Sequence, residues 1–396
     1  MSTMFLTNIG FGVILPTLPF LSQHLGASAI EMSLAISVFS VASLFAGVVW
    51  GAVSDRIGRR QVLIMGVVGY GVTSALLALV PNVATLLLLR FFSGVMAAAV
   101  FPSSLALVTN WTTPEERPRI LGIMGSVNGI GFICGPPVGA FLSVFGIQVP
   151  FLCVGLLSIV NGLLAFQLLP RTSGRTDGHS EGGKVEARKI GIGALLRFFR
   201  NKMIAPLLLG TLVISIVDAS ISATLSYFIV GPLQSNETMA GWAFMITAGV
   251  SSLIQATVFS RVFERLGDIV TIVIGFGFGT LGYLLLGMSQ YVAWAFLSLA
   301  IVSVCRGLAF PSITTSISLH APVELQGSSF GAHSTVGSLG RTIGPLLAGW
   351  MYTYEERSPY FLASGLLFAT LVFYLVWMNR MRKMAQGKSA SVQDTM

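Results

Sequence analysis

Residues 51–60 read Gly-Ala-Val-Ser-Asp-Arg-Ile-Gly-Arg-Arg, a short charged segment between two apolar runs at 31–53 and 61–80. Each run is close to the roughly 20 residues that a helix needs to cross the hydrocarbon core of a bilayer. Long apolar runs and short polar connections alternate in this way along the whole chain. This pattern predicts an all-α polytopic membrane protein.

The composition of the 396-residue chain supports the same fold class. Hydrophobic residues make up 54% of it and charged residues 10%, whereas soluble globular proteins carry about 25% charged residues. The chain also lacks the low hydrophobicity and high charge of disordered sequences. The net charge of +8 does not indicate a nucleic-acid partner, because the cations lie in the short connections and form no base-reading face.

The apolar runs predict twelve membrane spans. These must be helices, because unpaired strand edges cannot be satisfied in lipid and the alternating pattern of a membrane barrel is absent. The predicted spans are 3–23, 31–53, 61–80, 84–109, 119–143, 148–170, 203–231, 238–262, 268–288, 291–319, 327–352 and 359–379.

One connection is much longer than the others and divides the spans six and six. Residues 171–202 are polar, Gly-rich and basic, so we expect a cytoplasmic linker there. The predicted organisation is an N-terminal six-helix bundle at 1–170, a pseudo-symmetric C-terminal six-helix bundle at 203–380 and a cytoplasmic tail at 381–396.

The cations predict the orientation of the chain in the membrane. With both termini cytoplasmic, the even-numbered connections and the C-terminal tail hold 19 of the 23 Lys and Arg residues, as the positive-inside rule requires. No basic segment precedes the first apolar run, so we interpret this run as a retained span and not as a cleaved signal peptide. We expect a multi-pass protein of the plasma membrane, which is the inner membrane in a bacterium.

The two six-span halves repeat at an offset close to 209 residues. Three segments return in register: Asp55-Arg56-Ile-Gly58 as Glu264-Arg265-Leu-Gly267, Phe101-Pro102-Ser103 as Phe310-Pro311-Ser312, and Gly131-x-x-x-Gly135-Pro136 as Gly340-x-x-x-Gly344-Pro345. Duplicated halves related by an axis along the membrane normal place a binding site near the midplane, and one half can rock against the other. The repeat therefore favours a transporter over a receptor or a membrane enzyme.

Four motifs give the chain a family resemblance. They are the loop residues Gly51, Asp55, Arg56, Gly58, Arg59 and Arg60, the span 4 segment Arg90-Phe-Phe-Ser-Gly94, the span 5 residues Gly131, Gly135, Pro136 and Gly139, and the span 1 residues Gly12, Pro16 and Pro19. On these motifs, the chain resembles the major facilitator superfamily in its twelve-span drug:proton antiporter branch. The resemblance covers nearly the whole sequence.

The resemblance implies roles for the loop motif and the span 5 motif. It implies that Asp55 latches the two halves on the cytoplasmic side, with the start of span 11 as its partner, and that the span 5 motif is a proton-tight hinge. The residues alone say less: Gly131, Gly135 and Gly139 are spaced four apart and so share one helix face, which also suits simple helix packing. Pro136 favours a bend in that helix.

Charged residues within the spans are the strongest chemical lead, because each costs at least about 2.5–3.5 kcal/mol at the centre of a membrane helix. Asp218 is the only acid that lies well within a predicted span. Because removal from water disfavours the charged form of a carboxylate, Asp218 could bind the coupling proton, attract a cationic substrate, or do both by exchange. The alternative is a structural hydrogen bond to a neighbouring Ser or Arg.

Three arginines and a histidine complete the candidate set. For Arg90 the resemblance implies proton transfer or gating, and the alternative is snorkelling or a clamp on a backbone carbonyl. Arg341 in span 11 could face Asp218 or favour anionic substrates, and Arg306 lies in span 10. His333 titrates near neutrality and is a second proton candidate, although a lone His is more often simply packed or hydrogen-bonded.

The leading hypothesis is a secondary transporter that exports hydrophobic or amphipathic small molecules by proton antiport with alternating access. Span 1 carries Asn8 and no acid, which departs from many drug antiporters and leaves the charge of the substrate open. The alternative is a carrier of a specific polar metabolite such as a sugar or an amino acid, which would need more midplane acids and carboxamides. A non-transporting sensor would need an added soluble domain or a degraded loop motif.

The expected partners are a small-molecule substrate, protons and the lipid bilayer, and we expect the chain to act as a monomer. The sequence holds no nucleotide-binding motif in a strand–helix context. It also holds no metal-ligand cluster and no nucleophile–base pair. We therefore expect neither an enzyme, nor a bound metal, nor a cofactor.

Overall fold

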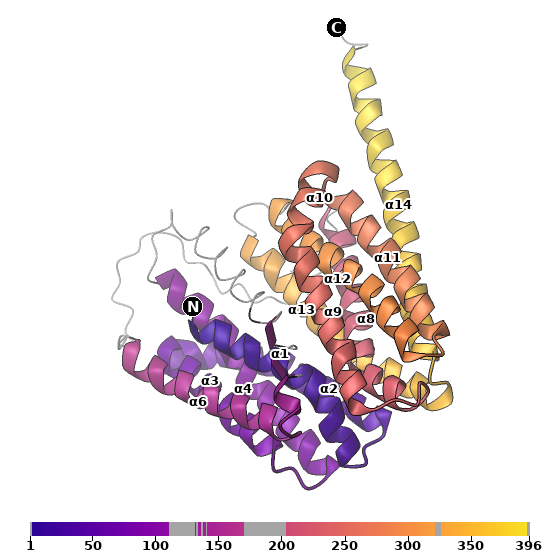
Figure 1. Ribbon diagram of the computed structural model, residues 1–396. Coiled ribbons are helices and arrows are strands. Elements are labelled where there is room, and N and C mark those ends of the chain that lie inside the picture. Colours follow the sequence, from indigo (N-terminus) through magenta and orange to yellow (C-terminus); the bar gives the residue numbers. More distant parts are fainter. Residues whose placement is uncertain are drawn as a thin grey trace. The chain divides into compact units, whose positions relative to one another are not determined.

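The computed structural model describes residues 2–110, 131, 134, 135, 138, 139, 141–169, 203–320 and 326–393. All regular elements of this part of the chain are helices (Figure 1). They are α1 (Ser2–His24), α2 (Ala29–Ile57), α3 (Arg59–Leu77), α4 (Val83–Asn110), α6 (Val149–Leu168), α8 (Ile204–Val230), α9 (Glu237–Thr257), α10 (Phe259–Leu266), α11 (Asp268–Met288), α12 (Val292–His320), α13 (Gln326–Tyr354) and α14 (Ser358–Gln393). The described residues from 131 to 143 are also helical.

Within the described residues, nine helices are long and apolar enough to span a membrane. α1 adds a tenth as a bent span, because its segments Thr3–Ile14 and Thr17–His24 meet at 44°. The break falls at residues 15 and 16, and residue 16 is a proline, whose ring removes a backbone hydrogen bond from the helix.

α13 is long enough to span but is not among these apolar helices. Its 29 residues include glycines, serines and threonines together with His333 and Arg341. Polar residues in a membrane helix normally face the protein interior or a water-filled space. α13 is therefore the helix in which functional side chains are most expected.

Most predicted span boundaries agree with the helices, and three segments need comment. The predicted last span ended at residue 379, whereas α14 continues as a helix to Gln393, so most of the predicted tail is helical. The predicted span 238–262 is broken, because α9 ends at Thr257 and α10 begins at Phe259. The predicted span 119–143 lies largely outside the described residues, as does the predicted linker 171–202.

The chain packs into two compact units that do not coincide with the two predicted bundles. Unit 1 contains residues 1–189, 218–249 and 341–359, and unit 2 contains residues 190–217, 250–340 and 360–396. The division crosses α8, α9 and α13. The two-bundle organisation therefore stays a prediction.

The core of unit 1 joins helices from the N-terminal part of the chain with α8 from its middle. Leu18 of α1, Met32 of α2, Tyr70 of α3 and Phe151 of α6 are buried in one cluster together with Ala223 of α8. None of these side chains is more than 1% exposed, so this cluster is a close-packed interior in which small changes in volume are costly.

The internal repeat is visible in the backbone of each unit. Gly58 after α2 and Gly267 after α10 both have positive φ, 97° and 82°, a conformation that glycine adopts at little cost. Their N–H groups donate to the carbonyls of Ser54 and Phe263, each at 3.0 Å. All these positions are separated by the offset of 209 residues that the sequence predicted.

The repeat extends to helix packing. A Cβ atom at Gly66 would lie 2.7 Å from Ala99 Cβ, and one at Gly275 would lie 2.8 Å from Ala309 Cβ. Glycine therefore permits the close approach of α3 to α4 in unit 1 and of α11 to α12 in unit 2. Such contacts between small residues are typical of helix pairs in membranes.

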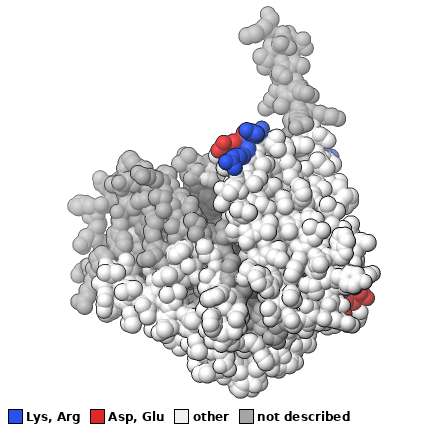
Figure 2. Space-filling model, in the orientation of Figure 1, with Lys and Arg blue, Asp and Glu red and all other residues white. Residues whose placement is uncertain are grey.

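The surface in Figure 2 is almost free of charged side chains over the described part that this view shows. Blue and red atoms gather mainly in one small patch at the end where α10 lies (Figures 1 and 2). α10 carries Arg261, Glu264 and Arg265, all exposed. Large exposed apolar side chains on the other helices, such as Leu156 of α6 at 66% and Phe368 of α14 at 55%, suit contact with lipid tails.

Candidate functional site

Asp218 of α8 and Arg341 of α13 lie in unit 1 and interact electrostatically. Asp218 is half-buried and Arg341 is exposed. Two contacts between α8 and α13 flank the pair: Ser220 Oγ donates to Gly344 O at 2.8 Å, and a Cβ atom at Gly340 would meet the backbone of α8 at 2.9 Å. The structure thus places the acid within the spans and one of the three arginines singled out from the sequence on two helices that contact each other.

Arg90 of α4 lies in the interior of unit 1, where it is 4% exposed. Its Nε donates to the carbonyl of Ala35 at 3.3 Å, and its guanidinium carbon lies 4.3 Å from the centroid of the Phe39 ring, a favourable cation–π geometry. Arg90 therefore clamps α4 to α2 through a carbonyl and a ring, and its role in proton transfer stays a prediction.

His333 of α13 and Arg306 of α12 lie in unit 2. His333 Nδ1 lies 3.0 Å from Thr211 Oγ1 of α8, and the centroid of its ring lies 6.4 Å from that of Phe310 of α12. Arg306 is half-buried. These contacts place His333 among three helices, as expected of a hydrogen-bonded histidine, and they leave its role as a proton carrier untested.

The loop motif is described only in part. Arg60 Nη2 donates to the carbonyl of Phe166 in α6, and the Arg60 guanidinium carbon lies 5.0 Å from the centroid of the Phe166 ring. Arg56 is exposed and Arg59 is half-buried. The side chain of Asp55 lies outside the described residues, so its latch to the start of α13 stays a prediction.

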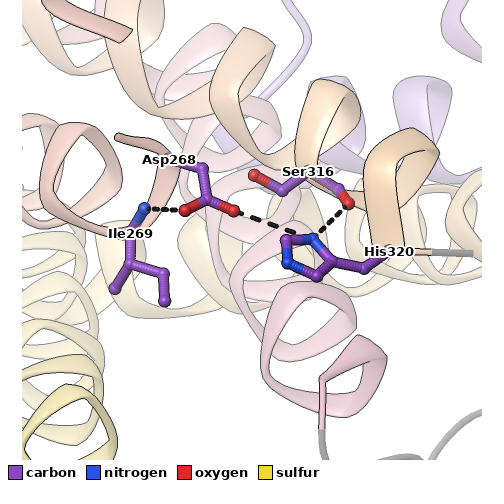
Figure 3. A network of polar contacts seen from close by, with 4 residues as sticks. All are labelled: Asp268, Ile269, Ser316 and His320. Carbon is purple, nitrogen blue, oxygen red and sulfur yellow. Dashed lines mark hydrogen bonds and ion pairs between the residues drawn. The ribbon is translucent and has the colours of Figure 1, made fainter. Parts of the chain in front are cut away.

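The second copy of the loop motif forms a polar network that the sequence did not predict (Figure 3). Asp268, the first residue of α11, accepts a hydrogen bond from Ile269 N at 2.8 Å through Oδ1. Its Oδ2 lies 3.7 Å from His320 Nδ1 at the end of α12, and the same nitrogen lies 2.9 Å from the carbonyl of Ser316. A carbonyl oxygen can only accept, so His320 Nδ1 carries the hydrogen in this contact.

The glycines of the span 5 motif pack directly against the backbone of α1. Cβ atoms at Gly131, Gly135 and Gly139 would meet backbone oxygens of α1 at 2.6–2.8 Å. Gly12 of the span 1 motif is the residue that Gly135 approaches most closely, and Pro19 of that motif is buried. The three glycines therefore share one face and allow two backbones to touch, while Pro136 lies outside the described residues.

Three contacts in unit 1 join α2, or the turn before it, to α8 and α13, two of them near the predicted outer ends of these helices and one, from Ser37, nearer the middle. Ser37 Oγ of α2 donates to the carbonyl of Thr342 at 2.8 Å, and Tyr227 Oη of α8 donates to the carbonyl of Ala27 at 3.0 Å. Gly349 lies directly against α2. These contacts could not be predicted from the sequence, because a hydrogen bond from a hydroxyl to a carbonyl of a distant helix leaves no local sequence pattern.

The described residues include no group of three or more His, Cys, Asp or Glu side chains that could hold a metal ion. What this site offers chemically is a protonatable carboxylate beside a guanidinium. Such a pair can exchange a proton or an ionic ligand without covalent chemistry.

Comparison with known proteins gives matches over nearly the whole chain. The profile of the Major Facilitator Superfamily matches residues 1–345 and, in a second match, residues 207–393. Multidrug resistance protein 1 of Bacillus subtilis is 25% identical over 386 residues, which cover 95% of each protein. Quinolone resistance protein NorA of Staphylococcus aureus is 25% identical over 378 residues, which cover 94% of each.

Solved structures agree with the fold. The nucleoside transporter NupG superposes with a TM-score of 0.73 at 16% sequence identity, covering 95% of this chain and 97% of that one. At this identity the likeness concerns the fold alone. Together with the profile match, it confirms the predicted all-helical membrane fold.

Proposed function

The chain belongs to the Major Facilitator Superfamily, and from this premise we propose that it exports hydrophobic or amphipathic small molecules in exchange for protons. The names of the relatives, a multidrug resistance protein and a quinolone resistance protein, support drug efflux as the activity. The matches extend over almost the full length of both relatives, so no large part of their chains lacks a counterpart here.

The observation that carries the proposal is the position of Asp218. It is the acid within the predicted spans, it is half-buried, and it interacts electrostatically with Arg341 on the adjoining helix α13. An ionised group in a membrane helix is costly and is normally retained for a function. We assign Asp218 the coupling proton, which it would take up on one side of the membrane and release on the other.

Alternating access would use the helix contacts described above. The bond from Tyr227 to Ala27 joins the predicted outer end of α8 to the turn before α2, and the bond from Ser37 joins α2 to α13 nearer the middle of the spans. Contacts on the outer half of the spans suit a state closed towards the outside. Breaking these few hydrogen bonds, each worth about 1 kcal/mol, would open that side at a modest cost. The glycine face on α1 would let helices adjust without collision between side chains.

The remaining parts of the proposal concern orientation and assembly. The distribution of Lys and Arg supports cytoplasmic termini and a location in the plasma membrane, the inner membrane of a bacterium. We expect a monomer whose partners are substrate, protons and lipid. Reporter fusions at each terminus and a mass measurement in detergent test these statements.

Asp218→Asn in proteoliposomes tests the coupling. An imposed gradient, acid outside, is expected to drive export of the hydrophobic cation ethidium from vesicles with the wild-type protein and not from vesicles with Asp218→Asn. Counterflow of labelled against unlabelled ethidium, which needs no net proton movement, is expected to survive in the variant. Asp268→Asn is the matched control, because this aspartate is the first residue of α11 and so lies at the end of a span, and because it belongs to unit 2 whereas Asp218 belongs to unit 1. An unchanged gradient dependence in Asp218→Asn would refute the assignment.

A further inference from the structure

Arg341 lies on a face of α13 that is distinct from the lipid-facing side. The exposed apolar side chains Leu339, Ile343, Leu346, Leu347 and Trp350 form one stripe at helical spacing, as expected of a surface in contact with lipid tails. At about 100° per residue, Arg341 lies nearly opposite the middle of this stripe. Ser334, seven residues earlier and also exposed, shares the face with Arg341.

The two flanks of this polar face are occupied by protein. On one flank, Gly340 and Gly344 contact α8. On the other flank, the carbonyl of Thr342 accepts the hydrogen bond of Ser37 from α2. Arg341 is thus exposed between two helix contacts and away from lipid, where an ionic ligand could reach its guanidinium.

The charge of Asp218 decides whether such a ligand is needed. Asp218 on the adjoining helix α8 interacts electrostatically with Arg341, so its ionised carboxylate offsets part of the positive charge and an anion gains little there. After Asp218 takes up a proton, the guanidinium loses this contribution, and positive charge within a membrane protein is costly. An anionic oxygen group can then replace the carboxylate, because guanidinium binds carboxylates and sulfonates through paired, charge-assisted hydrogen bonds.

We propose that Arg341 is a binding residue for amphipathic organic anions, and that an anion bound there crosses the membrane together with a proton on Asp218. Relative to the empty protein, the proton adds one positive charge and the anion adds one negative charge, so the doubly loaded state carries no additional charge. Loading with either partner alone adds an uncompensated charge. Electrostatics therefore favours crossing of the membrane by the proton and the anion together, in the same direction. This activity is a proton–anion symport.

This inference rests on the proposed transport function and adds an activity to it. The hydrophobic cations of the proposed function move against the proton, whereas anions bound at Arg341 move with it. The charge of the transported molecule then decides whether it moves with or against the proton that Asp218 carries.

The test uses two permanently charged probes with the same aromatic body, 1-pyrenesulfonate and a pyrenylmethyl trimethylammonium salt. Neither probe has a neutral form, so neither follows the pH gradient through the lipid. Proteoliposomes hold the full chain, the outside is made acid, and the membrane potential is clamped at zero with potassium and valinomycin. The wild-type protein is expected to take up the sulfonate at least about tenfold faster than protein-free vesicles and to release preloaded ammonium probe.

Variants at Arg341 and at Asp218 separate the roles of the guanidinium and of the carboxylate. Arg341→Gln is expected to reduce sulfonate uptake to the level of protein-free vesicles, Arg341→Lys is expected to restore part of it, and Arg357→Gln, outside the predicted spans, is the matched control. Asp218→Asn mimics the protonated acid, so only its anion-loaded form lacks an uncompensated charge. This variant is therefore expected to exchange labelled for unlabelled sulfonate across the membrane but to show no net uptake driven by outside acid. Size-exclusion chromatography shows whether each variant is folded, and the behaviour of Asp218→Asn keeps the test decisive if Arg341→Gln does not fold.

Each outcome bears on one proposal or both. Absence of sulfonate uptake in the wild type, or uptake that persists in Arg341→Gln, overturns the symport while export of the ammonium probe leaves the proposed function standing. Failure of both probes to move overturns both proposals. Sulfonate that leaves the vesicles in response to outside acid overturns the predicted direction of coupling and with it the symport.

Discussion

Gly135→Ala is expected to destabilise the protein by about 2 kcal/mol. A Cβ atom at this position would lie 2.6 Å from Gly12 C and 2.8 Å from Ile9 O, whereas ordinary contacts begin at 3.4 Å. The obstacles are backbone atoms of α1, which cannot rotate away as the end of a side chain could. Overpacking of this kind costs about 1–3 kcal/mol, and the higher helix propensity of alanine offsets up to about 1 kcal/mol of it.

Gly277→Ala in α11 is the matched control, because a Cβ atom there would meet no atom within 4 Å. This variant is expected to be as stable as the wild type or up to about 1 kcal/mol more stable. Thermal unfolding in detergent, followed by circular dichroism, measures both. We expect a lower midpoint for Gly135→Ala and slower gradient-driven export. A midpoint for Gly135→Ala equal to or above that of Gly277→Ala would show that α1 does not touch the glycine face, and the packing argument would be wrong.

Three further predictions concern polar contacts between helices, two hydrogen bonds and one ion pair. Ser37→Ala removes the bond to the Thr342 carbonyl (2.8 Å) and is expected to shift the protein towards the outward-open state by about 1 kcal/mol, measured as faster labelling of cysteines introduced at the outer ends. Tyr374→Phe removes the buried bond to the Pro206 carbonyl (2.8 Å) and is expected to lower the thermal midpoint by the equivalent of about 1–2 kcal/mol. Asp268→Asn breaks only a partly exposed ion pair, so its cost is expected to stay below about 1 kcal/mol and to vanish in high salt.

Each of these substitutions has a counterpart or a result that would contradict it. Ser334→Ala removes an exposed hydroxyl from α13 and is expected to leave cysteine labelling unchanged, so equal effects of Ser334→Ala and Ser37→Ala would refute the role of the Thr342 bond. Tyr354→Phe alters a tyrosine that is 77% exposed, and a midpoint as low as that of Tyr374→Phe would contradict the burial argument. A salt-independent loss of stability in Asp268→Asn would show that the aspartate does more than pair with His320.

The hydropathy pattern predicted most of the fold because the bilayer makes one demand on every span. Roughly 20 apolar residues per helix are readable from the sequence alone, and the turn glycines Gly58 and Gly267 mark where helices end. α13 satisfies the length but not the apolarity. It was nevertheless among the twelve spans predicted from the apolar runs, because a stripe of apolar residues continues along it.

The candidate site was predictable only in its residue types. The scarcity of charge singled out Asp218, Arg90, Arg306 and Arg341, and the expectation that Arg341 could face Asp218 stays a prediction. The bond from Ser37 to α13 and the network of Asp268 with His320 were missed. Such contacts depend on the crossing of helices that are far apart in the sequence, and no local pattern encodes a crossing.

The internal repeat also shows how the two copies of one helix contact differ in charge. The contact between α1 and the residues from 131 to 139 corresponds, at the offset of 209, to the contact between α8 and α13. In the first copy this contact is made by glycines against backbone, and Asn8 nearby donates to the Met4 carbonyl of its own helix at 2.7 Å. In the second copy the same pair of helices carries Asp218 and Arg341. The first copy can therefore act as a close-packed contact along which the two helices move, while the second copy carries the charges. A single acid then suffices, because the proton and an anionic substrate would be coupled at this one helix contact.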